Sequence, residues 1–523
     1  MSRAAGFARL VPGPAAAVFW FWLVAVPVVH QPRLLNGDGD LARHLRHGQW
    51  ILEHGAVIRQ DPFSLTHAGR PFVGFEYGSQ VMYAMAHRAG GLAGVTALAV
   101  ALIALACALV ARFLLRRGVD PLLAFLGAML AGVVAQVHFA ARPHLVTFVF
   151  TALLLELLER PKRPPWWAFA VFFAAWTNLH AGALFGLVVV GIYLAAAVVE
   201  GLDPDRWHEA WPRMRSLGLI LLLGTVALFA TPYGAEGPLH IARFFGDRYL
   251  RGQTAEFFSP SFHWAGMKPF LAVLLGTVVA FGWSRERVPL SSLLVIAATL
   301  GFALLAQRNV SLFAFTGLPL LLLHLDAPWK RLPDPRGLRA GFARGASQAT
   351  DWPWIAAGAL VLAAIAANSG RIRQVQVLHE RFDMRAFPVV LVEDARQRAL
   401  EGRYFHEFTW GGYLLYAWPG QPIFIDGGTD FFGGAHLRTY LAIRGMAPGW
   451  RDSLRAYDID HALLGVRTPL AHELARDPAW GLERCDATAV LLSRSVPHAG
   501  TEADSLASCL AATRAGRPPE DTE

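Results

Sequence analysis

The sequence has few charged residues and few cysteines. Charged side chains make up 16% of its 523 residues and hydrophobic ones 54%, which is too apolar for a water-soluble protein of this length. The three cysteines, Cys107, Cys485 and Cys509, contain no CxxC pair, so the common redox and zinc motifs are excluded. Cys485 and Cys509 could still pair in an oxidising compartment. The composition therefore predicts a multispan α-helical membrane protein.

Other features are missing as well. No small-x-small cleavage site follows the first apolar run, so we expect a retained anchor helix rather than a removed signal peptide. The net charge is +8, but Lys and Arg form short clusters beside apolar segments rather than one stripe, so no nucleic-acid partner is expected. The chain also has no self-similar halves and little charge within its apolar segments, which argues against a transporter or a lipid flippase.

Apolar segments long enough to cross a bilayer, or nearly so, predict about eleven transmembrane helices. They lie at residues 13–30, 92–115, 119–139, 143–158, 166–182, 183–200, 217–233, 267–283, 288–306, 309–325 and 353–369. Arginine and lysine clusters occur in every second connection between these segments. The other short connections hold only Arg142 and Arg308 as positive residues. Positive residues beside spans are retained in the cytoplasm, so we expect a cytoplasmic N-terminus.

The pattern divides the chain into three parts. Residues 1–369 form the predicted transmembrane domain, with a long outer loop at 33–91. Residues 370–497 alternate helical and extended patterns, which predicts an extracytoplasmic α/β domain. Its expected helices are 389–400, 410–417 and 450–457, and its expected strands are 404–408, 422–426, 461–464 and 489–493. Residues 498–523 are polar, with Pro518 and Pro519, and are expected to be disordered.

The outer loop has its own elements. A helix is predicted to run to Glu53, with Gly55 as its stop signal. Residues 77–89 have an amphipathic pattern, which predicts a second helix lying in the membrane interface.

The predicted orientation gathers the unusual polar residues on the outer side. A single polar cavity there is the economical hypothesis, because charged groups near lipid must face one another or water. We expect Asp40 and Glu76 to be catalytic. A transferase that moves a sugar from a lipid phosphate to a hydroxyl acceptor needs a carboxylate to take the proton of that hydroxyl. Arg142 and Arg308, with His144, are expected to bind a donor phosphate. The expected substrate-binding residues are His44, Asn178 and His180.

Each of these residues has a plainer interpretation. Asp40 can be a helix cap and Glu76 a solvated loop charge, while Asn178 and His180 can satisfy the backbone of the turn between two spans. Asp40, His44 and His47, at helical spacing, could ligate a divalent metal together with His144 or His180. Histidines on a polar helix face are more often hydrated, so no metal ligand is assigned and a metal cofactor stays an alternative.

The outer loop also carries a resemblance. The stretch GDLARHLRHGQWILEHG from Gly39 to Gly55, then DPFS and the aromatic-flanked Glu76, resembles the first outer loop of bacterial GT-C glycosyltransferases. These are similar to protein mannosyltransferases and to enzymes that move arabinose-type sugars onto lipid A. The pieces RPHL, NLH, TPYG, QRN, WGGYL and PIFIDG resemble polar outer pieces of uncharacterised relatives.

The resemblance implies a multispan fold in the bacterial inner membrane, a polyprenyl-phosphate-linked sugar as donor, an active site at the outer face, and inversion at the anomeric carbon. It assigns the catalytic acid position to Asp40 and the second acidic position to Glu76. Phe75 stands where protein mannosyltransferases have the first acid of an Asp-Glu pair, so the acceptor stays open among lipid, glycan and protein. No WWDYG-type signature is present, which argues against transfer of a whole glycan to asparagine. A multispan transporter or lipid flippase and a non-catalytic membrane scaffold stay as alternatives.

Overall fold

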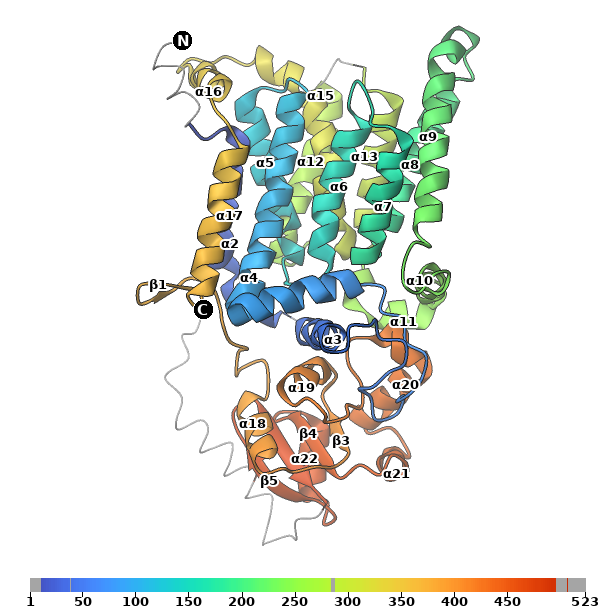
Figure 1. Cartoon of the computed structure of the whole chain (residues 1–523), viewed down its shortest axis with the longest axis vertical. Coiled ribbons are helices and arrows are strands. Elements are labelled where there is room, and N and C mark those ends of the chain that lie inside the picture. Colours follow the sequence, from blue (N-terminus) through green and yellow to red (C-terminus); the bar gives the residue numbers. More distant parts are fainter. Residues whose placement is uncertain (1–10, 38, 284–286, 495–505, 507–523) are drawn as a thin grey trace.

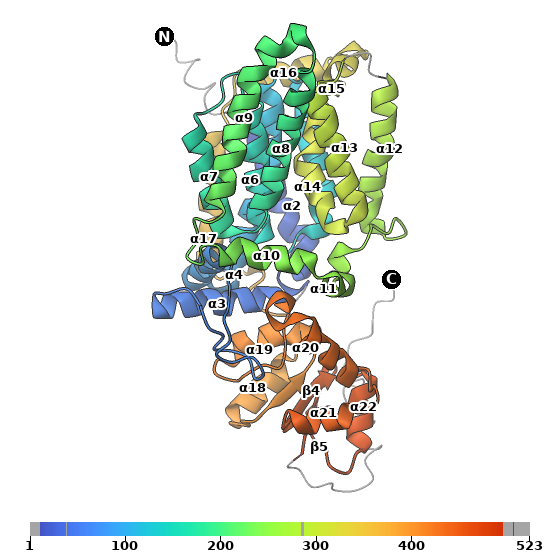
Figure 2. The same cartoon turned by 90° about the vertical axis from the view of Figure 1, so that its right-hand side faces the viewer.

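The computed structural model, described for residues 11–37, 39–283, 287–494 and 506, consists of a helical bundle and a smaller α/β region at one end of it (Figure 1). We call the bundle end that carries the α/β region the loop end, and the other the opposite end. Figure 2 shows the same arrangement after a quarter turn, with α10 lying across the loop end.

Within the described residues, each predicted apolar segment coincides with a helix. The bundle helices are α2 (Pro14–Asn36), α4 (Tyr77–Arg116), α5 (Pro121–Ala135), α6 (His144–Leu158), α7 (Trp166–Leu179), α8 (Ala183–Glu200), α9 (Trp207–Ala227), α12 (Lys268–Trp283), α13 (Leu290–Leu305), α14 (Val310–Phe315), α15 (Gly317–Arg331) and α17 (Trp352–Ala367). Four helical segments in the described ranges are long and apolar enough to cross a membrane, or five if the bent α14–α15 pair is one span. The chain is a multi-pass membrane protein, but the number eleven stays a prediction.

The outward-facing side of the bundle is apolar. Val28 on α2, Val278 on α12, Leu305 on α13 and Leu360 on α17 are each at least 69% exposed. Exposing such a surface to water costs free energy, whereas exposing it to the hydrocarbon of a bilayer does not. The bundle surface is therefore suited to contact with lipid tails.

The outer loop lies across the loop end of the bundle. Its first helix, α3 (Asp40–His54), ends at Gly55, whose φ of 63° is the left-handed conformation that a glycine adopts most readily. α4 breaks at Gly90 and Gly91, where the backbone leaves the helical region. Figure 1 shows that the part of α4 before this break lies across the bundle end, as the amphipathic pattern predicted, and that the part after it runs along the bundle.

A second polar segment lies at the same end, between α9 and α12. It contains α10 (Glu236–Gly246), α11 (Arg248–Gln253) and the short 3-10 turn η4 (Ala255–Phe257). Another 3-10 turn, η6 (Gln307–Asn309), joins α13 to α14. The Gln307 backbone N–H donates to the Phe258 carbonyl at 2.8 Å, which ties this turn to the polar segment.

The α/β region contains a four-stranded sheet in the order β3 (Tyr404–His406), β4 (His461–Gly465), β6 (Ala489–Ser493) and β5 (Gly481–Cys485). β3 and β4 are parallel, with Tyr404 opposite His461, whereas β6 is antiparallel to both of its neighbours. The region's helices are α18 (Val389–Gln397), α19 (Gly411–Ala417), α20 (Thr429–Arg444), α21 (Trp450–Ala456) and α22 (Pro469–Arg476), and a two-stranded hairpin, β1 (Arg371–Ile372) and β2 (Val375–Gln376), precedes them.

One predicted strand, 422–426, does not join this sheet. Instead, Ile423 pairs with the outer loop: its N–H donates to the Phe63 carbonyl at 3.1 Å, and its carbonyl accepts from the Leu65 N–H at 2.7 Å. His87 on α4 and the Tyr416 hydroxyl add a hydrogen bond of 2.9 Å. The α/β region is therefore joined to the outer loop by backbone as well as side-chain contacts.

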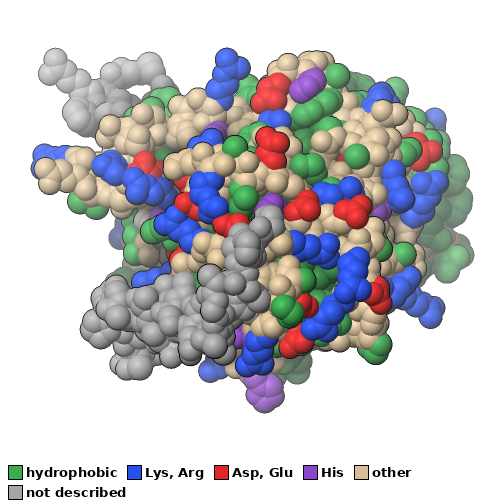
Figure 3. Space-filling model, turned by 90° about the horizontal axis from the view of Figure 1, so that it is seen from below, with side chains coloured by type: hydrophobic (Ala, Val, Ile, Leu, Met, Phe, Trp, Pro, Cys, Tyr) green, Lys and Arg blue, Asp and Glu red, His purple; other side chains and the backbone are tan. Residues whose placement is uncertain are grey.

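The opposite end of the bundle carries the arginine clusters. Arg116 and Arg160 pair with the buried Glu156 at 2.6 and 3.0 Å, and α16 (Leu338–Ser347) lies at the same end (Figure 1). The far face of the α/β region has Lys, Arg, Asp and Glu side chains intermixed, as a water-facing surface would (Figure 3). Cys107 is buried and free, whereas Cys509 and, apart from Leu506, the predicted tail 498–523 lie outside the described residues.

Candidate functional site

A cavity of about 640 Å³ lies between the loop end of the bundle and the α/β region. The bundle side is formed by α3, the start of α6, the α7–α8 turn and η6, and the other side by residues of 408–409, Gly427 and α20. Seven of the eight predicted site residues line it: Asp40, His44, Glu76, Arg142, His144, His180 and Arg308. Segments more than 250 residues apart in sequence thus meet at one site.

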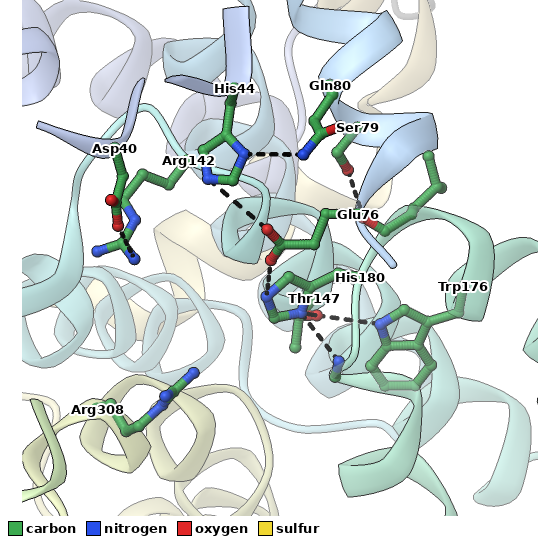
Figure 4. Close-up of polar contacts among 12 residues, drawn as sticks. Asp40, His44, Glu76, Ser79, Gln80, Arg142, Thr147, Trp176, His180 and Arg308 are labelled. Atoms are coloured by element: carbon green, nitrogen blue, oxygen red, sulfur yellow. Dashed lines mark hydrogen bonds and ion pairs between the residues drawn. The ribbon is translucent and has the colours of Figure 1, made fainter. Parts of the chain in front are cut away.

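Asp40 is the first residue of α3, at the N-terminus where a carboxylate is stabilised by the helix dipole. Its Oδ2 lies 2.7 Å from Arg142 Nη2, and its Oδ1 lies 3.6 Å from Arg43 Nη2, one helical turn along α3. Figure 4 shows Asp40 and Arg142 facing each other at one side of the site. The carboxylate is held from two directions, with its side chain 14% exposed to the cavity.

Glu76 lies between two histidines, just before α4 begins. Its Oε1 is 3.3 Å from His180 Nε2, and its Oε2 is 3.7 Å from His44 Nε2 (Figure 4). His180 Nδ1 accepts the Gly182 N–H at 2.9 Å, so this ring carries its hydrogen on Nε2 and donates it towards Glu76. The Thr147 hydroxyl, 2.8 Å from the same Nδ1, fixes the ring further.

His44 is fixed in a similar way by Gln80, whose amide nitrogen lies 3.3 Å from His44 Nδ1. Burial, together with the charges of Arg43 and Arg142, holds the pKa of His44 well below its usual value, so the ring is neutral. Burial also raises the pKa of Glu76, to about 7, because the opposing effect of Arg43 and Arg142 is smaller. Glu76 is therefore a carboxyl group that changes its charge near neutral pH.

The two predicted phosphate-binding arginines meet at Glu256 of η4, a residue that the sequence did not single out. Arg142 Nη1 lies 2.7 Å from Glu256 Oε1, and Arg308 Nη1 lies 4.0 Å from Oε2. Burial acts to raise the pKa of Glu256, but the positive charges of Arg142, His138 and Arg308 outweigh it and bring that pKa to about 2. Glu256 is therefore ionised at neutral pH, pairs closely with Arg142 and lies at the outer limit of an ion pair with Arg308.

Two predicted residues are engaged elsewhere. His144 lines the cavity, but its Nε2 lies 2.8 Å from the His138 carbonyl. Asn178 is not part of the lining: its amide nitrogen donates to the Ala174 and Ala230 carbonyls at 2.7 and 2.8 Å, and its oxygen accepts from the Tyr77 hydroxyl. Asn178 therefore ties α7 to the segment after α9 and to Tyr77, rather than facing the cavity or satisfying the turn between α7 and α8.

The side chains are not arranged for the metal site considered above. His47 is buried and stacks on Phe63, with ring centroids 4.9 Å apart. Across the described ranges, no three His, Cys, Asp or Glu side chains are grouped closely enough to hold a metal ion.

Several lining residues were not predicted as part of the site. Arg43 was not singled out from the sequence, although its position one helical turn after Asp40 was a usable signal. Asp430, at the start of α20, lies 2.8 Å from His240 of α10 and links the α/β-region side of the cavity to the polar segment. Glu407 and Arg444 form an ion pair of 3.0 Å on the same side of the cavity.

With this geometry the chain can be compared with known proteins. No protein-family model matches the sequence, and no curated protein matches it significantly. The structure, by contrast, has the fold of the GT-C membrane glycosyltransferases over most of its length.

Two solved structures show this likeness. One is the archaeal oligosaccharyltransferase AglB from Archaeoglobus fulgidus, in complex with an inhibitory peptide and a dolichol-phosphate; it is 12% identical, with a TM-score of 0.54 over 86% of this chain and 69% of AglB. The other is ArnT from Cupriavidus metallidurans in its apo state, 13% identical, with a TM-score of 0.50 over 94% of this chain and 98% of ArnT. At these identities the likeness establishes the fold, and the resemblance seen in the outer loop is confirmed at that level.

Proposed function

We propose that the chain is an inverting glycosyltransferase that moves a sugar from a polyprenyl-phosphate donor to an acceptor. The observation that carries this proposal is the cavity, in which an acidic group, Asp40, and two arginines, Arg142 and Arg308, face one space at the end of a membrane bundle. AglB, which shares the fold, was solved with a dolichol-phosphate, a lipid phosphate of the expected donor class. The acceptor class is left open.

In the proposed reaction the acceptor hydroxyl oxygen attacks the anomeric carbon, and the bond from that carbon to the donor phosphate oxygen breaks. The hydroxyl proton passes to Asp40, and the polyprenyl phosphate leaves with the bonding electrons. Arg142 and Arg308 stabilise the charge that develops on the phosphate. Because Arg142 contacts Asp40 at 2.7 Å, a bound phosphate would share this guanidinium and leave the carboxylate free to face the acceptor.

Glu76 would accept a hydrogen bond from the acceptor and orient it, with His44 and His180 holding the carboxylate in place. The lipid part of the donor has an apolar side of the cavity available, formed by Ile241, Phe244, Phe245 and Phe257. Phe245 is 46% exposed, so this side reaches the surface at the level where α10 crosses the bundle end. Lateral entry of a lipid-linked donor from the membrane fits this geometry.

The direct test is sugar transfer, or slow hydrolysis, from a panel of polyprenyl-phosphate sugars by the purified full-length protein in detergent or nanodiscs. Turnover with at least one donor is the expected result. A folded protein that turns over no donor and binds no polyprenyl phosphate would contradict the proposal and favour a transporter or scaffold.

Removing one phosphate-binding group should weaken donor binding. We expect Arg308→Ala to raise the Kd for polyprenyl phosphate at least about tenfold, because a charge-assisted hydrogen bond contributes roughly 1.5–3 kcal/mol. Arg243→Ala is the matched control, since Arg243 lies on α10 outside the cavity lining and its side chain is 68% exposed. Binding can be measured by calorimetry, and equal affinity of both variants would remove Arg308 from the donor site.

We further propose that the loop end faces the outside of the bacterial inner membrane and that the N-terminus is cytoplasmic. The arginine clusters at the opposite end support this orientation. In a background without native cysteines, a membrane-impermeant thiol reagent should label Arg243→Cys in intact cells. It should not label Arg206→Cys, at the opposite end and similarly exposed (61%). The reverse labelling pattern would overturn the orientation.

A further inference from the structure

Three glycines form a close contact between the α/β region and the N-terminus of α3. A Cβ atom built on Gly427 would overlap Asp40 Oδ1, and one built on Gly412 would overlap the Gly39 carbonyl oxygen. A Cβ built on Gly39 would in turn overlap the Thr409 carbonyl oxygen. The backbone of the α/β region thus lies directly against the residue proposed as the base.

Space, rather than backbone conformation, is what requires glycine here. None of these three glycines has a left-handed φ, the conformation that would by itself favour glycine. A side chain at Gly412 or Gly427 would collide with the N-terminus of α3, and one at Gly39 would collide with the α/β region. Gly412 and Gly427 belong to the WGGYL and PIFIDGG stretches, and these stretches touch each other, because a Cβ on Gly411 would overlap the Ile425 carbonyl.

The turn that carries Gly427 is itself fixed. On one side, Asp426 Oδ1 accepts the Gly428 N–H at 2.8 Å. On the other, Asp430 lies 2.8 Å from His240 of α10. A turn held at both ends is a rigid surface, and a rigid neighbour restricts the rotamers of the side chain that it touches.

We propose that the α/β region completes the active site by seating the Asp40 carboxylate, with Gly427 as the positioning residue. Arg142 faces Oδ2, and the Gly427 backbone closes the other side at Oδ1, so the carboxylate has one orientation towards the cavity. This inference rests on the proposed function for its catalytic consequence. The contact itself does not depend on that function: a side chain larger than hydrogen at position 427 would overlap the Asp40 carboxylate.

The first experiment compares Gly427→Ala with Gly252→Ala in the full-length protein. Gly252 lies on α11 beside the cavity, and a Cβ there meets nothing within 4 Å. We expect Gly427→Ala to lower kcat about tenfold or more while the donor KM changes less than about twofold, because a displaced base affects the chemical step rather than donor binding. Gly252→Ala should keep both values. Wild-type kcat in Gly427→Ala, or an equal loss in both variants, would overturn the positioning role.

The second experiment needs no activity. The thermal midpoint Tm is measured for Gly427→Ala in the wild-type and in the Asp40→Ala background, where the colliding carboxylate is gone. We expect a drop in Tm in the first background and less than half of it in the second. If Gly427→Ala alone does not fold, a folded double variant gives the same result. Equal drops in both backgrounds would overturn the contact, whereas failure of the proposed function would show as a wild type without turnover and leave this cycle intact.

Discussion

Asp40→Asn should abolish sugar transfer while leaving donor binding intact. An amide keeps the shape of the side chain at the start of α3 but cannot take the proton of an acceptor hydroxyl. Loss of a positioned general base costs about 10²- to 10⁴-fold in turnover, and Glu256, the other acid that contacts Arg142 at 2.7 Å, is held in that ion pair. We therefore expect kcat to fall by about 10³-fold.

The control has to separate catalysis from folding. Glu53→Gln removes an acid at the other end of the same helix, where the side chain is 52% exposed and pairs with Arg46. It should keep wild-type kcat and KM. Polyprenyl-phosphate binding by Asp40→Asn should stay within about threefold of wild type, because Arg142 keeps Glu256 and Arg308 as neighbours. Turnover above a tenth of wild type would show that another group is the base.

The sequence predicted the bundle because lipid-facing and buried helices are both apolar, so long hydrophobic runs identify them. It could not predict elements whose side chains break such patterns. β5 reads Gly481–Cys485 with Glu483 and Arg484 in it, and it is an edge strand whose register shifts at that point. α20 contains Gly433 with a φ of 77°, which kinks the helix and interrupts its 3.6-residue period.

The site divides in the same way. Asp40, Glu76, Arg142 and Arg308 were predicted to lie together because the alternation of spans places them at one membrane face, and the structure brings them into one cavity. Glu256 lies in an irregular segment that has no helical or strand periodicity, 114 residues from Arg142 in sequence. No local sequence pattern therefore predicts their ion pair. The contact of Gly427 with Asp40 could not be predicted either, because it depends on how the α/β region packs against the bundle, almost 400 residues away in sequence.

Glu76→Gln should remove a pH dependence as well as activity. Since the pKa of Glu76 is about 7, the wild-type carboxyl group is mostly protonated at pH 6 and mostly ionised at pH 8. If the ionised form orients the acceptor, wild-type kcat/KM rises through this range, with its midpoint near 7. Glutamine cannot ionise, so the variant should have a flat profile between pH 6 and 8 and turnover about 100-fold below wild type at pH 8. A wild-type-like midpoint in the variant would assign this titration to another group.

The same substitution should stabilise the protein, and only at high pH. The folded state raises the pKa of Glu76 from 4.5 to about 7, so folding favours its protonated form. Below about pH 4.5 the acid is protonated whether folded or unfolded, and wild type and variant should unfold alike. Between about pH 4.5 and 7 the unfolded chain ionises this acid while the folded protein holds it protonated, and above 7 the folded wild type carries a buried charge. The free energy of unfolding of the wild type therefore falls by about 3 kcal/mol from pH 4.5 to 7 and stays low above 7, a loss that the glutamine variant avoids. Thermal unfolding in detergent at pH 5 and pH 8 should therefore show a higher Tm for Glu76→Gln at pH 8 and a much smaller difference at pH 5.

The control is Glu236→Gln, on an acid of α10 whose side chain is 59% exposed, and it should show neither effect. A gain in stability with a loss of turnover is what distinguishes a carboxylate kept for chemistry from one kept for folding, because removing a structural ion pair would lower both.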